Sequence, residues 1–337
     1  MYDSYNCDVL IIFFNRPEPL RKVFASVRQA RPKRLFLAQD GARESKRTTD
    51  EAGIHACREI VSRIDWPCEV LTNYAEQNLS CDEREFSAIS WAFQHTDRLI
   101  ILEDDCVPCP SFYSMCDYLL EKYKDDERIQ QISGFNRLEE YPDYPYDYMI
   151  STVSAGYGWA TWKRVWDEVE KLHDLEFLDD HDYMDHLFDD AIRCMDKSHA
   201  GYRERGHYVR QRNRELQKTY SWEYAFGIQR VLSNALVITP RKNMVQNIGT
   251  TVDSTHTNEL ELLPKRLRKI FMMSSYDVHF PLHEPPFVTR NLGYEAAVAK
   301  SYYPGFVYGQ LEHMEAFYLK LKHWGLRKTL QWVRTKL

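Results

Sequence analysis

The most informative absence in this sequence is that of a long apolar segment. The 337 residues contain no apolar run of about 18 residues, the length that a transmembrane helix needs. The opening stretch MYDSYNCDVLII has no basic segment followed by a long apolar run, so we expect no signal peptide. Both absences predict a cytoplasmic protein, either soluble or held peripherally at the inner face of the cell membrane.

Excess charge, ordered cysteine spacing and repetition are also missing. The net charge is only −6, which disfavours a general nucleic-acid-binding protein. The eight cysteines stand at irregular intervals, unlike those of a small secreted domain built on disulfides. Internal repeats and low-complexity tracts are not evident. With 44% hydrophobic residues, the chain can bury the core of one large domain or two ordinary ones.

What the sequence does contain is an alternation of strand and helix patterns over the first 125 residues. Short, continuous apolar runs are typical of buried parallel strands, and they occur at residues 8–14, 34–38, 68–72 and 98–102. Between them, apolar residues recur at the spacing of one helix face, and a further helix is opened by Pro110. Repeated strand–helix units predict an α/β fold with a doubly wound sheet and helices on both faces.

Beyond residue 130 the alternation stops. The stretch GYGWATWKRVWDE places Trp159, Trp162 and Trp166 at helical spacing and predicts a tryptophan-rich amphipathic helix. A second helix is predicted at 184–195. The later stretch SWEYAFGIQRVLSNALVITP reads as a helix followed by a strand.

Polar side chains follow each predicted strand at its carboxyl end. They are Asn15-Arg16, Gln39-Asp40, Thr72-Asn73 and Glu103-Asp104-Asp105. Ligands of open α/β sheets bind outside the carboxyl ends of the strands. The three consecutive carboxylates of LIILEDD repel one another, so we expect a bound cation to relieve that repulsion. Hard oxygen ligands select Mg²⁺ or Mn²⁺, usually shared with substrate phosphates; the alternative is a solvated turn.

Five stretches, in this order along residues 7–257, resemble bacterial glycosyltransferases of the GT-A fold, relatives of the N-acetylglucosaminyltransferase I type. They are VLIIFFNRPEPLRKVFASVRQARPKRLFLAQDGAR, ILEDDCVPCPSFY, GWATWKRVW, SWEYAF and NIGTTVDSTHT. In this family E-D-D is a variant of the D-x-D motif. The resemblance implies a GT-A mixed sheet and a metal-dependent, inverting enzyme that uses a UDP-sugar.

The acid motif receives specific roles from the resemblance. Asp105 would ligate the Mn²⁺ or Mg²⁺ ion that bridges the nucleotide diphosphate. Asp104 and Glu103 would contact the ribose and the donor sugar.

The resemblance also assigns the nucleobase end. Arg16 and Asp40 would read the uracil, which agrees with the hydrogen-bonding capacities of an arginine donor and an aspartate acceptor. Asn15 would line the same pocket. The alternative is a salt bridge between Arg16 and Asp40 that only joins neighbouring loops.

An inverting transfer needs a carboxylate base, which the family places after a tryptophan at a helix start. Here the pair is Trp222-Glu223, so glutamate replaces aspartate and the longer side chain must be accommodated. The alternative for Glu223 is an acid that only favours the helix dipole.

Two further candidates are less distinctive. The segment VDSTHT resembles a loop that closes over the donor, with His256 as a metal or diphosphate ligand and Thr255 as a phosphate or acceptor contact. Trp159 would stack on the donor sugar. The alternatives are a solvated histidine and a tryptophan that only packs in the core.

The tail at 317–337 has six Lys or Arg residues and no acid, with large apolar residues between them. Such a segment fits a membrane surface rich in anionic lipid; the alternative is a packed C-terminal helix.

The expected organisation is a nucleotide-sugar-binding half at 1–130, an acceptor-binding and catalytic half at 131–260, and an extension at 261–337 that ends in the basic tail. The expected function is transfer of a hexosyl or N-acetylhexosaminyl group from a UDP-sugar to a saccharide, or to a lipid-linked oligosaccharide of a bacterial surface polysaccharide. A sugar-phosphate nucleotidyltransferase is the first alternative, although FFNRPEP lacks the glycine-rich phosphate loop that it needs. A catalytically silent carbohydrate-binding or membrane scaffold is the second.

Overall fold

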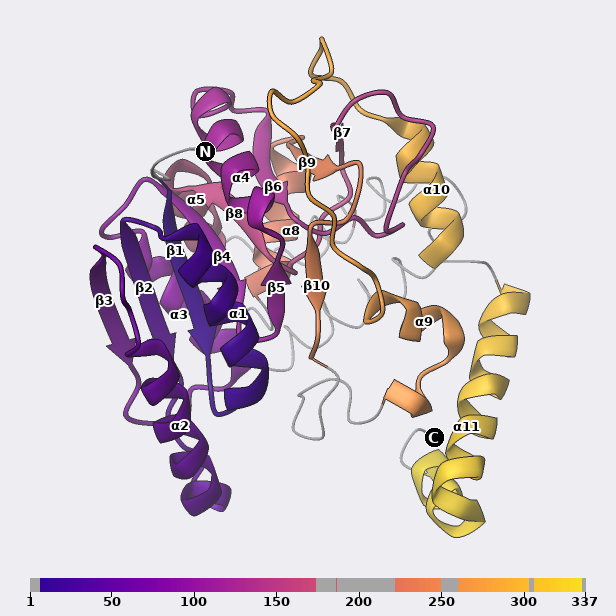
Figure 1. The fold of residues 1–337 in the computed structure, drawn as a ribbon. Coiled ribbons are helices and arrows are strands. Elements are labelled where there is room, and N and C mark those ends of the chain that lie inside the picture. The colour runs from indigo at the N-terminus through magenta and orange to yellow at the C-terminus, as the bar shows by residue number, and fades with distance from the viewer. Residues whose placement is uncertain (1–6, 174–185, 187–221, 250–259, 303–305, 335–337) are drawn as a thin grey trace.

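The computed structural model describes residues 7–173, 186, 222–249, 260–302 and 306–334. Its centre is an eight-stranded mixed sheet with the strand order β3-β2-β1-β4-β8-β6-β9-β7 (Figure 1). In chain order these strands are β1 (Asp8–Phe13), β2 (Arg34–Gln39), β3 (Glu69–Tyr74), β4 (Arg98–Glu103), β6 (Ile129–Ser133), β7 (Tyr148–Ser151), β8 (Trp159–Trp162) and β9 (Leu236–Pro240). A smaller sheet pairs β5 (Cys106–Pro108) with β10 (Val245–Asn247).

The first four strands of the large sheet are parallel. β1 pairs with β2 on one side and β4 on the other, and β2 pairs with β3. All four predicted strands are confirmed within two residues at each end. The third strand was expected to be buried, and this expectation was wrong. β3 is partly exposed because it is the edge strand, paired only with β2 in the described sheet.

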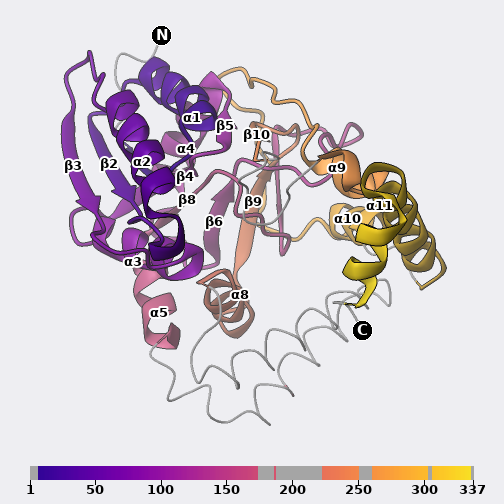
Figure 2. The ribbon, with the colours of Figure 1, turned by 90° about the horizontal axis from the view of Figure 1, so that it is seen from below.

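Helices cover both faces of the sheet, as the alternation predicts (Figure 2). On one face lie α1 (Pro17–Ala30), α2 (Arg47–Val61) and α4 (Pro110–Lys122). On the other lie α3 (Cys81–Ala92), α5 (Lys163–His173) and α8 (Trp222–Leu232). Short 3₁₀ turns, η1 (Glu44–Lys46) and η4 (Leu260–Leu262), complete the connections. The predicted class, a mixed α/β sheet with helices on both faces, is confirmed.

The tryptophan-rich helix was predicted to begin too early. Trp159 and Trp162 belong to strand β8, and α5 begins at Lys163. β8 runs antiparallel between β4 and β6 in the middle of the sheet, so ladder hydrogen bonds on both sides outweigh the helical spacing of the tryptophans. The predicted helix at 184–195 lies outside the described residues except for residue 186, whereas α8 and β9 confirm the helix and strand predicted after it.

The tryptophans form the contact between the sheet and α8. The rings of Trp159 and Trp222 are stacked, with centroids 5.2 Å apart and planes 8° apart. Trp166 and Phe226 pack around the pair. Full burial of a large apolar side chain stabilises a fold by roughly 2 kcal/mol, so this cluster fixes where α8 begins.

The predicted helical extension is present. It comprises α9 (Lys265–Ile270), α10 (Leu292–Tyr302) and α11 (Phe306–Arg334). Across the described residues, each helix is either too short or too polar to cross a membrane. The boundaries at 130 and 260 remain predictions, since the sheet is continuous between the two proposed halves.

Candidate active site

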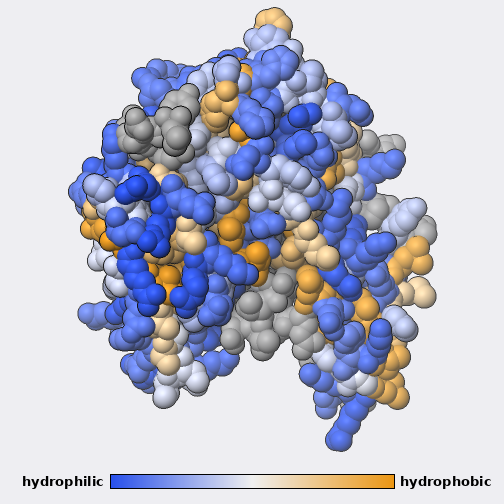
Figure 3. All heavy atoms as spheres, in the orientation of Figure 1, coloured by the Kyte–Doolittle hydropathy of each residue, from blue (hydrophilic) through white to orange (hydrophobic). Residues whose placement is uncertain are grey.

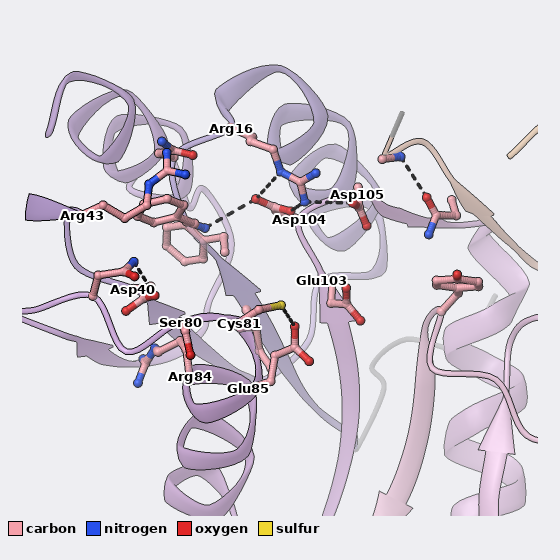
Figure 4. Close-up of a pocket in the computed structure, with 18 of the residues that line it drawn as sticks. Arg16, Asp40, Arg43, Ser80, Cys81, Arg84, Glu85, Glu103, Asp104 and Asp105 are labelled. Atoms are coloured by element: carbon pink, nitrogen blue, oxygen red, sulfur yellow. Dashed lines mark hydrogen bonds and ion pairs between the residues drawn. The ribbon is translucent and has the colours of Figure 1, made fainter. Parts of the chain in front are cut away.

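A pocket of about 360 Å³ lies at the carboxyl ends of β1, β2 and β4 (Figure 4). This is the edge where the strand-end residues were expected to gather. The pocket is lined by Asn15, Arg16, Asp40, Arg43, Asn78, Ser80, Cys81, Arg84, Glu85, Glu103, Asp104, Asp105, Tyr157, Asn247 and Gly249, together with four apolar residues. Five of the predicted nucleotide-binding residues and the predicted metal ligand Asp105 are therefore brought together.

The acid end of the pocket is built from two neighbouring strands. Glu103 closes β4 opposite Ile12 of β1, so the loop after β1 brings Arg16 to the following two acids. The Arg16 guanidinium ion-pairs with both Asp104 and Asp105, with 2.8 Å between Nη2 and the Asp105 Oδ2 atom. The positive charge of Arg16 thus already relieves part of the repulsion, which corrects the expectation that a bound ion alone relieves it.

Arg16 neutralises only part of this cluster. Burial raises the pKa of Glu103 well above its usual value, and the neighbouring Glu85 and Asp105 raise it further. Burial also raises the pKa of Asp104 to about 6, although the Arg16 charge opposes the rise. Three carboxylates facing one guanidinium leave excess negative charge, which a proton or a metal ion can compensate.

The arrangement fits a hard divalent cation. Ligand atoms of Glu103, Asp105 and Cys106 all lie within 4.8 Å of one another. Burial raises the pKa of the Cys106 thiol well above its usual value, and a thiol is a poor ligand for a hard cation, so Asp105 is the best candidate ligand of the three. The Asp105 carboxylate packs directly against Gly249, because a Cβ atom there would lie 2.2 Å from the Asp105 Oδ2 atom. Carboxylate oxygens suit Mg²⁺ or Mn²⁺.

The other end of the pocket is organised around Asp40. Its Oδ1 atom accepts hydrogen bonds from the backbone N–H groups of Gly41 and Leu79, both at 2.9 Å. Its Oδ2 atom accepts one from the Asn78 side chain at 2.8 Å. The expected alternative, a salt bridge between Arg16 and Asp40, is not the arrangement: Figure 4 shows Arg16 beside Asp104 and Asp105, and Asp40 apart from them.

Asn15 and Arg43 meet on Asp50. The Asn15 side chain donates to the Asp50 carboxylate at 2.8 Å, and Arg43 donates to it through Nη2 at 2.7 Å and Nε at 2.8 Å. The Arg43 guanidinium also lies over the Phe14 ring, 5.2 Å from its centroid. Asn15 therefore lines the pocket as predicted, held by a network that the sequence did not reveal.

Arg84 was not predicted. Its side chain lies in the first turn of α3, is only 4% exposed and lines the pocket below Asp40 in Figure 4. Its Nη2 atom donates to the backbone oxygen of Asn73 at 2.6 Å, whereas its Nε atom has no acceptor among the described residues. A buried cation with an unused donor is a candidate contact for a ligand.

Trp159 was expected to stack on the sugar, and this expectation is wrong. Its side chain is 1% exposed and packs on Trp222 and Phe226 inside the core. It is the first residue of β8 and is held by the rings of α8. Two positions earlier, Tyr157 reaches the pocket instead.

Glu223 is exposed in the first turn of α8. The preceding Trp222 is anchored from both sides: its ring stacks on Trp159, and its indole Nε1–H donates to the Glu85 carboxylate. Gly156 leaves room for the longer glutamate, because a Cβ atom there would lie 2.7 Å from the Glu223 Oε1 atom. The structure thus shows how a glutamate is accommodated at this position.

Glu85 is the second residue that the sequence did not single out. It accepts a hydrogen bond from the Cys81 thiol at 2.8 Å and one from Trp222. Burial raises its pKa to about 7, and the Glu223 charge contributes to the rise. Glu85 therefore links the acid end of the pocket to the start of α8. Thr255 and His256 lie outside the described residues, so their proposed contacts remain predictions.

No protein-family model and no curated protein sequence matches the chain. A mannosyltransferase from Pyrobaculum calidifontis, solved with GDP-Man and Mn²⁺, is similar at 11% identity and a TM-score of 0.33; the match covers 51% of this chain and 47% of the mannosyltransferase.

Two nucleotide-processing enzymes are similar at the same level. A 4-diphosphocytidyl-2C-methyl-D-erythritol synthase from Anaerococcus prevotii has 9% identity and a TM-score of 0.33, over 51% of this chain and 78% of that one. A UDP-glucose pyrophosphorylase solved with UDP-glucose has 7% identity and a TM-score of 0.29, over 49% and 80%. The fold class rests on the strand order of the sheet, and these likenesses assign no activity.

Proposed function

We propose that this chain is a metal-dependent, inverting glycosyltransferase of the GT-A type that moves a sugar from a UDP-sugar to a saccharide hydroxyl. The observation that carries the proposal is the pocket with two unlike ends, the acid cluster with Arg16 at one end and the hydrogen-bonded Asp40 at the other. A nucleotide diphosphate has matching unlike ends, a neutral base and an anion that travels with a divalent cation.

The Asp40 end is the proposed uracil site. Its carboxylate already accepts hydrogen bonds from Gly41, Asn78 and Leu79, and the Ser80 backbone N–H also stabilises its charge. In the proposal the imide N–H group of uracil donates to this carboxylate. In this proposal Asn15 helps to hold the base end in place through its hydrogen bond to Asp50. Arg16 would contact both the base and the diphosphate.

The acid end would hold Mn²⁺ or Mg²⁺ through Asp105, with Glu103 and Asp104 facing the donor sugar and ribose. The ion, when bound, would stabilise the negative charge of the leaving diphosphate. His256 and Thr255 are proposed to complete the donor side from the loop that contains them.

Glu223 is the proposed base. The acceptor oxygen forms a bond to the anomeric carbon as the bond from that carbon to the diphosphate breaks, and the hydroxyl proton passes to the Glu223 carboxylate. Attack opposite the leaving group inverts the anomeric configuration. The acceptor is proposed to be a saccharide or lipid-linked oligosaccharide of a bacterial surface polysaccharide.

A single experiment tests the reaction class. The purified chain is incubated with a panel of UDP-sugars and Mn²⁺, and slow donor hydrolysis is followed through release of UDP. The proposal predicts UDP and free sugar from one or a few donors. A nucleotidyltransferase would instead release pyrophosphate when it is given UTP and a sugar phosphate, and that result would replace the proposal.

A further inference from the structure

The last long helix, α11, contacts the rest of the protein through charged side chains. Glu312 forms an ion pair with Arg266 of α9 through two hydrogen bonds. The shorter one joins the Arg266 Nη2 atom and the Glu312 Oε2 atom at 2.6 Å. Glu315 accepts a hydrogen bond from the backbone N–H of Lys265 at 3.1 Å. The polar side of this part of the helix therefore faces inward.

Several of its apolar residues face outward. Tyr308, Leu311, Met314 and Tyr318 are 64%, 54%, 67% and 60% exposed, and together they form what we name the outer stripe. Figure 3 shows hydrophobic atoms along α11 at the edge of the molecule. A helix on a soluble domain usually buries its apolar face and exposes its polar face. Here four large apolar residues are exposed although others of the helix, such as Leu319 and Leu321, are partly buried, and an exposed apolar patch marks a surface that meets a partner.

The charge along α11 indicates which partner. The sequence has no acid after Glu315 and six Lys or Arg residues from Phe317 onward. The Trp324 ring lies between two ammonium groups, 5.8 Å from that of Lys320 and 4.7 Å from that of Lys328. Tyrosine, tryptophan and lysine side by side with exposed aliphatic residues are characteristic of a helix that lies in the interface of an anionic bilayer.

The backbone of α11 also changes direction. Gly325 has φ 76° and ψ 169°, outside the helical region, and it divides the helix. Such a positive φ is accessible to glycine without strain. Beyond it, Leu326 is exposed, and Figure 1 shows the ribbon turning at the same end of the molecule toward which the carboxyl ends of β1 and β2 point.

We infer that the outer stripe of α11 docks on the surface of an anionic phospholipid bilayer, with the basic residues around Trp324 at the headgroups. The stripe begins at Tyr308, so the surface extends beyond the tail expected from the sequence at 317–337. Docking would hold the pocket near lipid-linked molecules. The inference goes beyond glycosyl transfer and does not depend on it, because vesicle binding and UDP binding are measured in separate experiments.

The test is co-sedimentation of the full chain with vesicles of phosphatidylcholine containing 30% phosphatidylglycerol, against vesicles of phosphatidylcholine alone. The first variant combines Leu311→Gln, Met314→Gln and Tyr318→Gln. The matched control is Phe287→Gln, which removes an exposed apolar side chain from the loop between α9 and α10. A second variant, Lys320→Gln with Lys322→Gln, keeps the stripe and removes two charges.

The wild type and Phe287→Gln are expected to bind anionic vesicles at least tenfold more tightly than neutral ones. The triple variant should lose at least tenfold on anionic vesicles with an unchanged thermal unfolding midpoint, which shows that it is folded. The lysine variant should bind severalfold more weakly, with a shallower salt dependence. Equal vesicle binding by the wild type and both variants would overturn the inference. So would a wild type that binds neither vesicle but forms a dimer which the triple variant breaks, because a second copy then covers the stripe.

Discussion

The two ends of the pocket hold their carboxylates in opposite ways. Asp40 is surrounded by N–H donors from the backbone and from Asn78. The acids after β4 are surrounded mainly by one another, with Arg16 as the guanidinium that pairs with two of them. In the proposed function the same residue type would serve two ligands, a neutral hydrogen-bond donor at one end and a cation at the other.

This contrast predicts which substitutions should affect the two ends of the pocket differently. Changes at the acid end should remove metal dependence and turnover together. Changes at the Asp40 end should weaken nucleotide binding whether or not metal is present. The link between the ends and α8, through Glu85 and Trp222, should respond to pH.

The largest effect is expected for Asp105→Asn. The substitution removes a charged ligand from the proposed metal site, and metal ions contribute several kcal/mol of charge stabilisation in such reactions, so donor turnover should fall on the order of a thousandfold. UDP release from the donor with Mn²⁺ is the measurement. Asp65→Asn, in an exposed ion pair with Arg28, is the control and should keep the wild-type rate. A rate for Asp105→Asn within a few-fold of wild type would remove Asp105 from the site.

Glu223→Gln should come next. Loss of a general base lowers turnover by roughly 10²- to 10⁴-fold, while UDP affinity should stay the same because Glu223 lies at the start of α8, outside the pocket lining. Transfer to an acceptor, measured at saturating donor, checks this. Glu223→Asp retains a carboxylate and should keep more activity than glutamine. Near-normal transfer by Glu223→Gln would show that the base is elsewhere.

Asp40→Asn should weaken UDP binding about tenfold to a hundredfold. The substitution removes the charged acceptor of the proposed bond from the uracil imide N–H group, and a hydrogen bond to a charged group contributes about 1.5–3 kcal/mol. Calorimetry with UDP should show the loss with Mn²⁺ and also without it. If the loss appeared only with Mn²⁺, Asp40 would belong functionally to the acid end, and the contrast between the two ends would fail.

The smallest effect concerns stability rather than activity. Burial raises the pKa of Glu85 to about 7 from its usual 4.5. The folded protein therefore binds a proton more tightly than the unfolded chain does, so the stabilisation is complete below pH 4.5 and is lost as the pH rises through 7. Glu85→Gln should flatten that dependence, which amounts to on the order of 3 kcal/mol. Thermal unfolding in chelator across this pH range is the measurement, and an unchanged slope would contradict the assignment.

The first half of the fold could be predicted because its signals are local. Each of the strands β1, β2 and β4 is a short apolar run that ends in polar residues, and the polar residues mark the site edge. Asp40, Asp104 and Asp105 could be found this way. Trp159 could not be placed, since the spacing of Trp159, Trp162 and Trp166 fits a helix until β4 and β6 pair with β8.

Glu85 and Arg84 were missed for a different reason. In the sequence they are charged residues of a helix, a pattern typical of a solvated surface. Glu85 becomes part of the site only because Trp222, far along the chain, packs against it. Arg84 becomes part of the site because the first turn of α3 lies beside the pocket at the carboxyl end of β2. Contacts between distant segments have no local signal.

We propose that the two ends together form a site for a uridine diphosphate and a metal ion. Calorimetry of the full chain with UDP, first with Mn²⁺ and then with chelator, is the direct test. A joint site should give clear UDP binding with Mn²⁺, at least tenfold weaker binding in chelator, and weaker binding of GDP in both conditions. UDP binding that is absent, or equally tight with and without metal, would contradict it.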